Sequence, residues 1–200
     1  TLLIIDETHT ISTGYCGYTR THGLKPDFFP LEKPVAGGIP CSVFGSSAET
    51  AERIRKAEDE VGPGYSGIGT TLSANALQLH AMRANLQHVM TPANYRHMLD
   101  LSERLAKGVA AGIAQRKVPW HVSNVGARAE FVCSPTRPKN GGEAKKMMKP
   151  MLELAVHLFL LNRGVLIAPF HNMTLLSPAT SAAQVDHLIA TVGACLDELH

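Results

Sequence analysis

Over the first 90 residues, short apolar runs alternate with glycine-rich loops and with the starts of helices. The run "TLLIID" at 1–6 is apolar at consecutive positions, which is typical of a parallel strand buried on both faces. Two more short strands are expected at 27–31 and 41–45, on either side of a Gly-Gly turn. Strands that alternate with helix starts predict an α/β layer for this part of the chain.

Two helices are predicted between these strands and residue 90. Ser46 and Glu49 have the spacing of a capping box, which predicts a helix over 48–59. A second glycine-rich loop over 61–73 then leads into a helix over 74–90.

The pattern changes after residue 90. Thr91 and Pro92 suit the N-cap and the first position of a long helix with an apolar stripe at helical spacing. The stripe consists of Met98, Leu101, Leu105, Val109 and Gly112. Short strands are expected over 119–126 and 127–134.

Two later helices show apolar stripes as well. The first ends at Gly164 and carries Met148, Leu152, Ala155 and Phe159. The second starts with a Ser181–Gln184 cap and carries Val185, Leu188, Val192 and Leu199. Between them, "VLIAP" at 165–169 and "TLLS" at 174–177 are expected to pair as strands. This half predicts an α+β domain, so we place a domain boundary near residue 95, between domains 1–95 and 96–200.

Composition narrows the class of partner. The chain is 44% hydrophobic and 18% charged, with a formal net charge of +2 from interspersed residues. These values indicate a soluble globular protein, and the lack of a basic block argues against binding to nucleic acid or an anionic membrane. A small-molecule partner is therefore expected.

The cysteines and histidines give no metal pattern. The cysteines are widely spaced and form no Cys-x-x-Cys motif, at Cys16, Cys41, Cys133 and Cys195. Free thiols in a reducing cytoplasm are the simplest interpretation.

No apolar run approaches the roughly 20 residues of a membrane span, so we expect no membrane segment and a cytoplasmic location.

Lys33 lies between two apolar runs. A buried ammonium is costly, so such a lysine must be paired, neutral or covalently used. Desolvation would lower its pKa and make the amine a nucleophile toward an aldehyde. The alternative is a lysine whose head extends to water along apolar neighbours.

Two other features suit the same ligand. Asp6 and Glu7 follow the first predicted strand, where α/β sheets place ligand groups, and a carboxylate there can keep a ring nitrogen protonated. The loop "GIGTTLSANA" at 67–76 offers backbone amides, hydroxyls and a helix N-terminus to a phosphate. A satisfied acid and a capped helix are the alternatives. Taken together with Lys33, the features match pyridoxal phosphate.

The sequence resembles the class III, or omega-type, pyridoxal-phosphate aminotransferases of fold type I, and most closely the glutamate-1-semialdehyde aminomutase branch. Three ordered motifs carry the resemblance, and their lysine lies 27 residues after Asp6: "LLIIDETHT", "PDFFPLEKPVAGGIP" and "GTTLSANAL". The resemblance implies part of a large domain with a mostly parallel sheet, followed by a small C-terminal domain. Family chains are about twice as long, so this chain is expected to be the C-terminal portion of an enzyme.

The resemblance also implies roles. Lys33 would form the aldimine with the cofactor and move the substrate's α-proton. Asp6 would pair with the pyridinium nitrogen, and Thr8 would lie against the ring. Thr71, or Thr70 if the register differs by one, would reach the phosphate in a neighbouring subunit, which implies a homodimer with shared active sites.

The sequence departs from the family pattern near the lysine. Glu32 stands where glycine is common, Cys41 and Ser42 replace a more usual small pair, and Ala76 replaces a common proline. Because of these departures, the substrate cannot be inferred from the family alone. The groups expected to bind the cofactor are still present.

Substrate contacts are harder to assign. Arg128 is a candidate clamp for a carboxylate, with a surface salt bridge as the alternative. His9, Tyr15 and Tyr18 are close in sequence to Asp6 and are candidates to line the cleft, with ordinary loop packing as the alternative. Phe170 or His171 is a candidate for the entrance.

The first hypothesis for the reaction is a transaminase, which the replacement of the family's usual valine by Thr8 favours, and the alternative is an aminomutase. A transaminase moves an amino group between an amine or amino acid and a keto acid or aldehyde, whereas an aminomutase returns it to the adjacent carbon of the same molecule. Retention of the intermediate depends on loop closure, which sequence does not reveal. A catalytically inactive fragment that retains the fold is the third possibility. A nucleotide-binding domain is disfavoured because Gly-x-Gly-x-x-Gly and P-loop motifs are absent.

Overall fold

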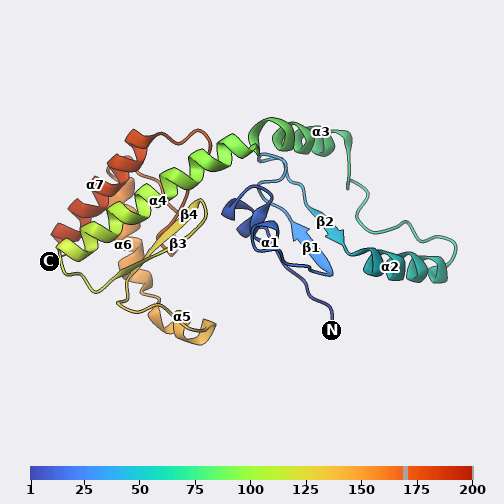
Figure 1. The fold of residues 1–200 in the computed structure, drawn as a ribbon, viewed down its shortest axis with the longest axis horizontal. Helices are drawn as coiled ribbons and strands as arrows, with labels where there is room; N and C mark the ends of the chain where they lie inside the picture. The colour runs from blue at the N-terminus through green and yellow to red at the C-terminus, as the bar shows by residue number, and fades with distance from the viewer. Residues whose placement is uncertain (169–170, 200) are drawn as a thin grey trace. The chain divides into compact units, whose positions relative to one another are not determined.

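The computed structural model describes residues 1–168 and 171–199. The chain separates into two compact units, Thr1–Pro92 and Ala93–His200, and each is treated by itself. Figure 1 shows the order of their elements. None of the helices in the described ranges is long and apolar enough to cross a membrane.

The N-terminal unit is built on a small antiparallel sheet. The two apolar runs form strands β1 (Phe28–Leu31) and β2 (Val43–Ser46), as predicted, and the structure pairs them antiparallel. The 3₁₀-helix η1 (Thr10–Thr13) and helix α1 (Gly17–Thr21) interrupt the loop that precedes β1. The core beneath the sheet consists of Ile11, Leu31, Val35 and Ala36, with partly buried apolar neighbours from β2, α3 and the adjoining loops.

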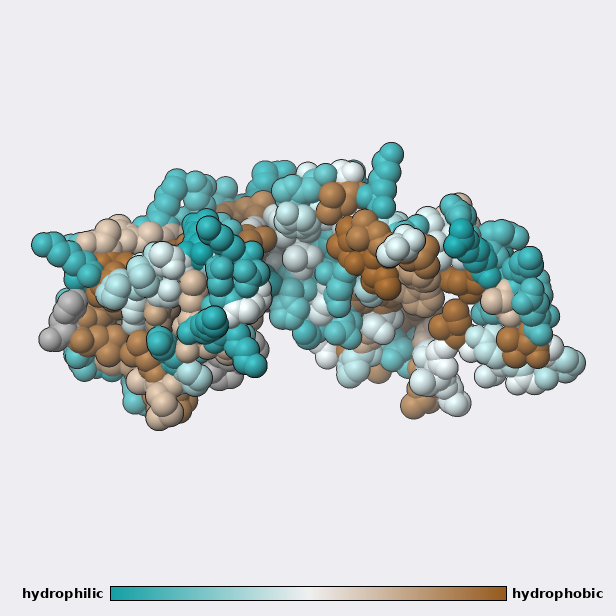
Figure 2. Space-filling view, turned by 90° about the horizontal axis from the view of Figure 1, so that it is seen from below, coloured by the Kyte–Doolittle hydropathy of each residue, from teal (hydrophilic) through white to brown (hydrophobic). Residues whose placement is uncertain are grey.

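The prediction of a buried strand over 1–6 is wrong. The segment runs parallel to β1, joined by a bridge between Ile4 and Phe28 and by a 3.0 Å hydrogen bond from the Ile5 amide to the Phe28 carbonyl. Leu2, Leu3 and Ile4 are nevertheless exposed, because no described layer covers either face of this segment. Exposed apolar side chains of this kind form brown areas on the surface in Figure 2.

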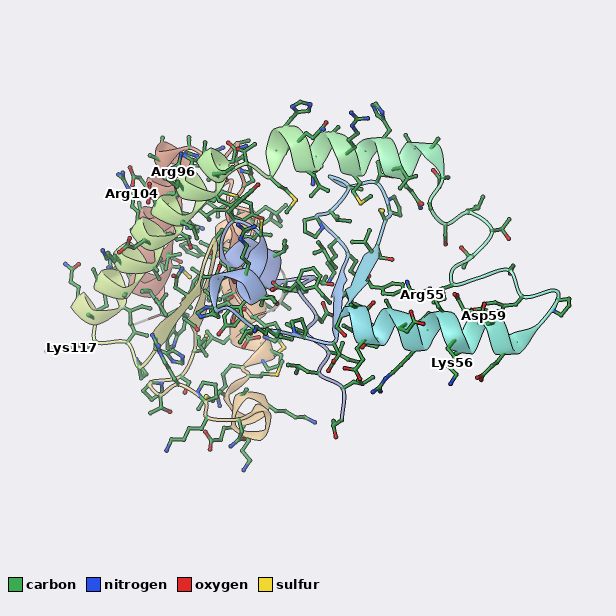
Figure 3. All side chains as sticks on the ribbon, turned by 45° about the vertical axis from the view of Figure 1, so that its right-hand side comes forward. Arg55, Lys56, Asp59, Arg96, Arg104 and Lys117 are labelled. Atoms are coloured by element: carbon green, nitrogen blue, oxygen red, sulfur yellow. The ribbon has the colours of Figure 1, made fainter. Side chains whose placement is uncertain are left out.

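The helices that follow differ in detail from the prediction. Helix α2 (Ala48–Val61) is capped by Ser47 and not by Ser46, since the Ser47 hydroxyl accepts the Thr50 amide at 3.2 Å. Figure 3 shows charged side chains of α2, Arg55, Lys56 and Asp59, on its exposed surface. The predicted helix over 74–90 is split into α3 (Ala76–Ala84) and a π-helical turn η2 (Asn85–Val89).

The C-terminal unit packs helices with a three-stranded antiparallel sheet. The strands are β3 (His121–Val125), β4 (Arg128–Val132) and β5 (Met173–Leu175), in the order β3-β4-β5. The helices are α4 (Pro92–Gln115), α5 (Gly141–Met147), α6 (Pro150–Leu161) and α7 (Ala182–Glu198). Arg104 on α4, labelled in Figure 3, makes a bidentate ion pair with Asp186 on α7.

Three expectations for this unit need correction. Residues 165–168 form no strand, and β5 pairs with β4 instead; Pro169 lies outside the described residues. Helix α6 buries Val156 and Leu160 in place of the predicted stripe, because all its residues except Glu153 and His157 are apolar and several apolar faces compete for burial. Leu199 is exposed beyond the end of α7, whereas the Ser181–Gln184 capping box is confirmed.

The four cysteines are free thiols. Burial raises the pKa of Cys133 to about 12 and that of Cys195 to about 11, so neither is a reactive thiolate at neutral pH. Within the described residues, no cluster of His, Cys, Asp or Glu is suited to hold a metal ion.

Candidate functional site

Lys33 lies in the turn that follows β1. Its backbone has φ +41°, a left-handed conformation that is uncommon for a residue with a side chain. Val35 and Ala36, two and three residues later, are buried in the core and fix the turn. Strained backbone of this kind persists only where the surroundings enforce it, and it is concentrated at functional sites.

Asn85 holds this turn from a distance of about fifty residues along the chain. Its buried side-chain amide donates to the Pro34 carbonyl at 2.7 Å and to the Val35 carbonyl at 3.1 Å. Asn85 begins the π-helical turn η2, and such turns are frequent at functional sites. The sequence analysis missed this residue, because no local pattern links an asparagine in a helix to carbonyls in a distant turn.

Replacement of Asn85 tests that role. We expect Asn85→Ala to lower the free energy of unfolding by about 1–3 kcal/mol, because two carbonyls lose their donor. The exposed Gln87 of the same turn supplies the control, and Gln87→Ala is expected to have little effect. Chemical denaturation of the full-length protein measures both. Equal stability of the two variants would contradict the role.

Glu7 is fully buried and anchors the loop that precedes β1. Its carboxylate accepts hydrogen bonds from the Thr10 hydroxyl at 2.7 Å, the Tyr18 amide at 3.0 Å and the Thr19 amide. Burial acts to raise the pKa of Glu7, but the bonds from Thr19, Thr10 and Tyr18 outweigh it and hold the pKa below its usual range. Glu7 is thus an ionised structural anchor.

Gly17 makes room for this carboxylate. It has φ +84°, and a Cβ added there would lie 2.8 Å from Glu7 Oε2. The chain therefore needs glycine at this position both for conformation and for space.

We expect Glu7→Gln to destabilise the full-length protein by about 1–3 kcal/mol at neutral pH, since an amide cannot accept at both oxygen positions. Because the pKa is lowered in the folded state, Glu7 contributes stability above the ordinary glutamate pKa of about 4.3 and loses it as the pH falls further. The difference between wild type and variant should accordingly shrink in acid. Thermal unfolding across pH measures it, with the exposed Glu60→Gln as control. A difference that does not change with pH would contradict the assignment.

Asp6, His9 and Lys33 form a charged group beside this anchor. Lys33 Nζ lies 2.8 Å from His9 Nε2, and Asp6 Oδ1 accepts the Thr8 amide at 2.8 Å. Hydrogen bonds from the Thr8 backbone and side chain lower the pKa of Asp6, with smaller contributions from the charges of His9 and Lys33. Two of the predicted residues, Asp6 and Lys33, thus interact electrostatically, and the buried Thr8 binds the Asp6 carboxylate.

The expected burial of Lys33 is wrong. Its side chain is exposed, because the turn after β1 projects the residue away from the core that holds Val35 and Ala36. The amine still has a specific partner in His9 and does not simply extend into water.

Lys33 lines an open hollow of about 520 Å³, a volume within the range of small-molecule sites. The other lining residues come from the end of β1, the Gly-Gly turn and α3: Glu32, Gly38, Ile39, Pro40, Cys41, Ser42 and Gln78. Two hollows of comparable size lie in the C-terminal unit, and neither is lined by any of the predicted cofactor-binding residues.

Thr70 and Thr71 are not brought to this hollow. Both are exposed in the loop between α2 and α3, and Thr70 bonds locally to the Ser73 hydroxyl. The role predicted for Thr71 belongs to a neighbouring subunit's cofactor, so it stays a prediction.

Arg128 lies on β4 in the C-terminal unit. Its Nη2 contacts the Met173 sulfur, and its Nε is buried with no hydrogen-bond partner among the described residues. The salt bridge considered as an alternative is not observed within the described ranges. An unpaired guanidinium edge is chemically suited to a carboxylate, and this role also stays a prediction.

The remaining candidates behave differently from one another. Tyr18, on α1, packs against His22 at the end of the same helix with ring centroids 3.9 Å apart, which is local packing. Tyr15 is exposed. His171 lines a hollow in the C-terminal unit, and Phe170 lies outside the described residues.

The donor set fits pyridoxal phosphate. The accessible Lys33 amine lines a hollow of small-molecule size. Asp6, which is held ionised, does not line that hollow but interacts electrostatically with Lys33 and His9. An amine and an ionised carboxylate of this kind are the groups that the sequence analysis expects in a pyridoxal-phosphate-dependent aminotransferase of fold type I.

Comparisons with known proteins agree with this class. A model of the class-III aminotransferase family matches residues 1–196, so the chain belongs to that family. The glutamate-1-semialdehyde 2,1-aminomutase of Thermus thermophilus is 30% identical over 98% of this chain and 45% of its own length. A second relative of the same name, from Halalkalibacterium halodurans, is 33% identical over 79% of this chain and 37% of its own length.

Solved structures of glutamate-1-semialdehyde aminomutases and other aminotransferases are also similar to this chain. A glutamate-1-semialdehyde-aminomutase from Pseudomonas aeruginosa superposes with a TM-score of 0.95 at 49% identity, over all of this chain and 45% of that one. A variant of a Pseudomonas aeruginosa glutamate-1-semialdehyde-aminomutase was crystallised in complex with PMP. The β-phenylalanine aminotransferase of Variovorax paradoxus, at 21% identity and a TM-score of 0.86, shares the fold. The chain thus spans less than half the length of these relatives.

Proposed function

We propose that the full-length enzyme containing this chain uses pyridoxal phosphate to move an amino group between an amine or amino acid and a carbonyl compound. The observation that carries the proposal is the Lys33 amine, which lines an open hollow, with the ionised Asp6 close enough for the charge of Lys33 to help lower its pKa. Membership of the class-III family supports it. When bound, the cofactor supplies an aldehyde for amines and a ring that withdraws electrons from the substrate's α-carbon.

Each of the candidate residues would have a separate role in the reaction. Lys33 holds the cofactor covalently at Nζ and, once displaced by the substrate's amine, carries the α-proton on the same atom. Asp6 keeps the ring nitrogen protonated, which increases the electron withdrawal, and Thr8 supports the Asp6 carboxylate. Thr71 would serve the phosphate of a partner subunit's cofactor, which implies a homodimer.

Adding an amino donor alone to the full-length enzyme tests this function. We expect the bound cofactor to change from its aldehyde form to its amine form, with release of the matching carbonyl product. The change is measured by absorbance and by analysis of the product. A cofactor spectrum that stays unchanged with every amino donor would favour a protein that retains the fold without the chemistry.

A second candidate is the aminomutase reaction, in which the amino group returns to the adjacent carbon of the same molecule. The 49% identity to the Pseudomonas aeruginosa aminomutase favours it. Supplying glutamate-1-semialdehyde to the full-length enzyme separates the two. Formation of 5-aminolevulinate without any second carbonyl compound supports the aminomutase, and a strict need for an acceptor supports the transaminase.

A further inference from the structure

We propose that His9 is a positioning residue that holds the Lys33 amine whenever that amine is not bound to the cofactor. The inference rests on the proposed function and deepens it. It begins from the 2.8 Å contact between Lys33 Nζ and His9 Nε2. The lysine amine carries N–H donors in either protonation state, and a histidine nitrogen without a proton accepts, so we assign His9 the neutral tautomer with the proton on Nδ1 whenever this hydrogen bond is formed.

The His9 side of the contact is held by its neighbours. His9 is the residue before η1, and the Ser12 hydroxyl donates to its carbonyl at 3.0 Å. The buried Thr8 and Ile11 flank it, and the Ile11 amide donates to the Glu7 carbonyl at 2.9 Å. The imidazole is therefore carried on a short segment fixed by the same loop that Glu7 anchors.

The Lys33 side is held independently. Asn85 bonds to the two carbonyls that follow Lys33, and Val35 is buried in the core. Two separately anchored backbone segments thus bring the exposed side chains of His9 and Lys33 within hydrogen-bond distance of each other.

Such a contact has a use in the reaction. After the substrate displaces it, Lys33 is a free amine on four flexible methylenes, and it must stay within reach of the α-carbon to move the proton. A hydrogen bond to His9 would limit the range of positions that Lys33 Nζ can occupy. The charged groups near this pair are Asp6, which interacts electrostatically with both members, and Glu32, which precedes Lys33 and lines the same hollow.

Two substitutions separate positioning from simple packing. His9→Phe keeps a ring but has no acceptor, whereas His9→Gln keeps an acceptor on a side chain of similar reach. We expect His9→Phe to lower kcat by about 10- to 100-fold with KM changed less than about threefold, since displaced reacting groups cost up to about 100-fold. His9→Gln should stay within about threefold of wild type.

Two further readouts make the test specific. An amino donor deuterated at its α-carbon should show a larger isotope effect on kcat in His9→Phe than in wild type, because proton transfer becomes slower relative to the other steps. Borohydride trapping of the cofactor on Lys33 should stay complete in both variants, because attachment does not require His9.

The kinetic and stability measurements on the two His9 variants can contradict the proposal. Wild-type kcat in His9→Phe would overturn the proposal, and so would equal losses in both variants accompanied by lower thermal stability, which would indicate a structural role. Absence of a borohydride label on Lys33 in the wild type would instead overturn the proposed function.

Discussion

Replacing Lys33 with alanine in the full-length enzyme should lower turnover by at least about 10⁴-fold, because one atom, Nζ, serves as both the attachment point and the proton carrier. The cofactor should still bind, since attachment to Lys33 is one of several predicted contacts. The rate is measured with the substrate pair that the wild type accepts, and retention of cofactor by absorbance after gel filtration.

The matched control for this substitution is Lys25→Ala. Lys25 is an exposed lysine of the same unit that does not line the hollow. It should leave the rate unchanged. Substantial turnover in Lys33→Ala, with Lys25→Ala reduced instead, would show that the wrong lysine has been assigned.

Asp6→Ala should lower the rate by about 10²- to 10³-fold, a loss typical of removing a fixed charge that stabilises the transition state. The effect on stability should be small, because the Asp6 side chain is exposed. The contacts from Thr8, and then the charges of His9 and Lys33, hold the pKa of Asp6 below its usual value of about 3.9. Protonation of Asp6 should consequently contribute no acid limb to the rate between pH 5 and 8.

Measuring the rates of wild type and Asp6→Ala from pH 5 to 8 checks both the loss of rate and the absence of an acid limb. The control is Asp59→Ala, which removes an exposed carboxylate from α2 (Figure 3) and should leave the rate unaffected. Equal rates for Asp6→Ala and wild type would remove Asp6 from the site.

The local elements were predictable because their signals are local. The two apolar runs around the Gly-Gly turn predicted β1 and β2, and the Ser181–Gln184 pair predicted the start of α7. The errors arise where neighbours distant in sequence decide the outcome. The segment 1–6 has the composition of a buried strand, yet burial depends on layers that the described residues do not supply there.

The site was predictable in its chemistry and only partly in its geometry. The motifs predict that Asp6 and Lys33 serve one site, and in the structure the charge of Lys33 contributes to lowering the pKa of Asp6. The division of labour between Asp6 and Glu7 was not predictable, because it depends on which carboxylate the loop around Gly17 encloses. Asn85 and the pairing of His9 with Lys33 likewise depend on tertiary contacts between distant segments.

Borohydride reduction of the full-length protein with its cofactor, followed by peptide mapping, tests the central claim most directly. The account predicts a pyridoxyl label on the peptide that contains Lys33 and on no other lysine. A label on a different lysine, or no label at all in the cofactor-loaded protein, would contradict it.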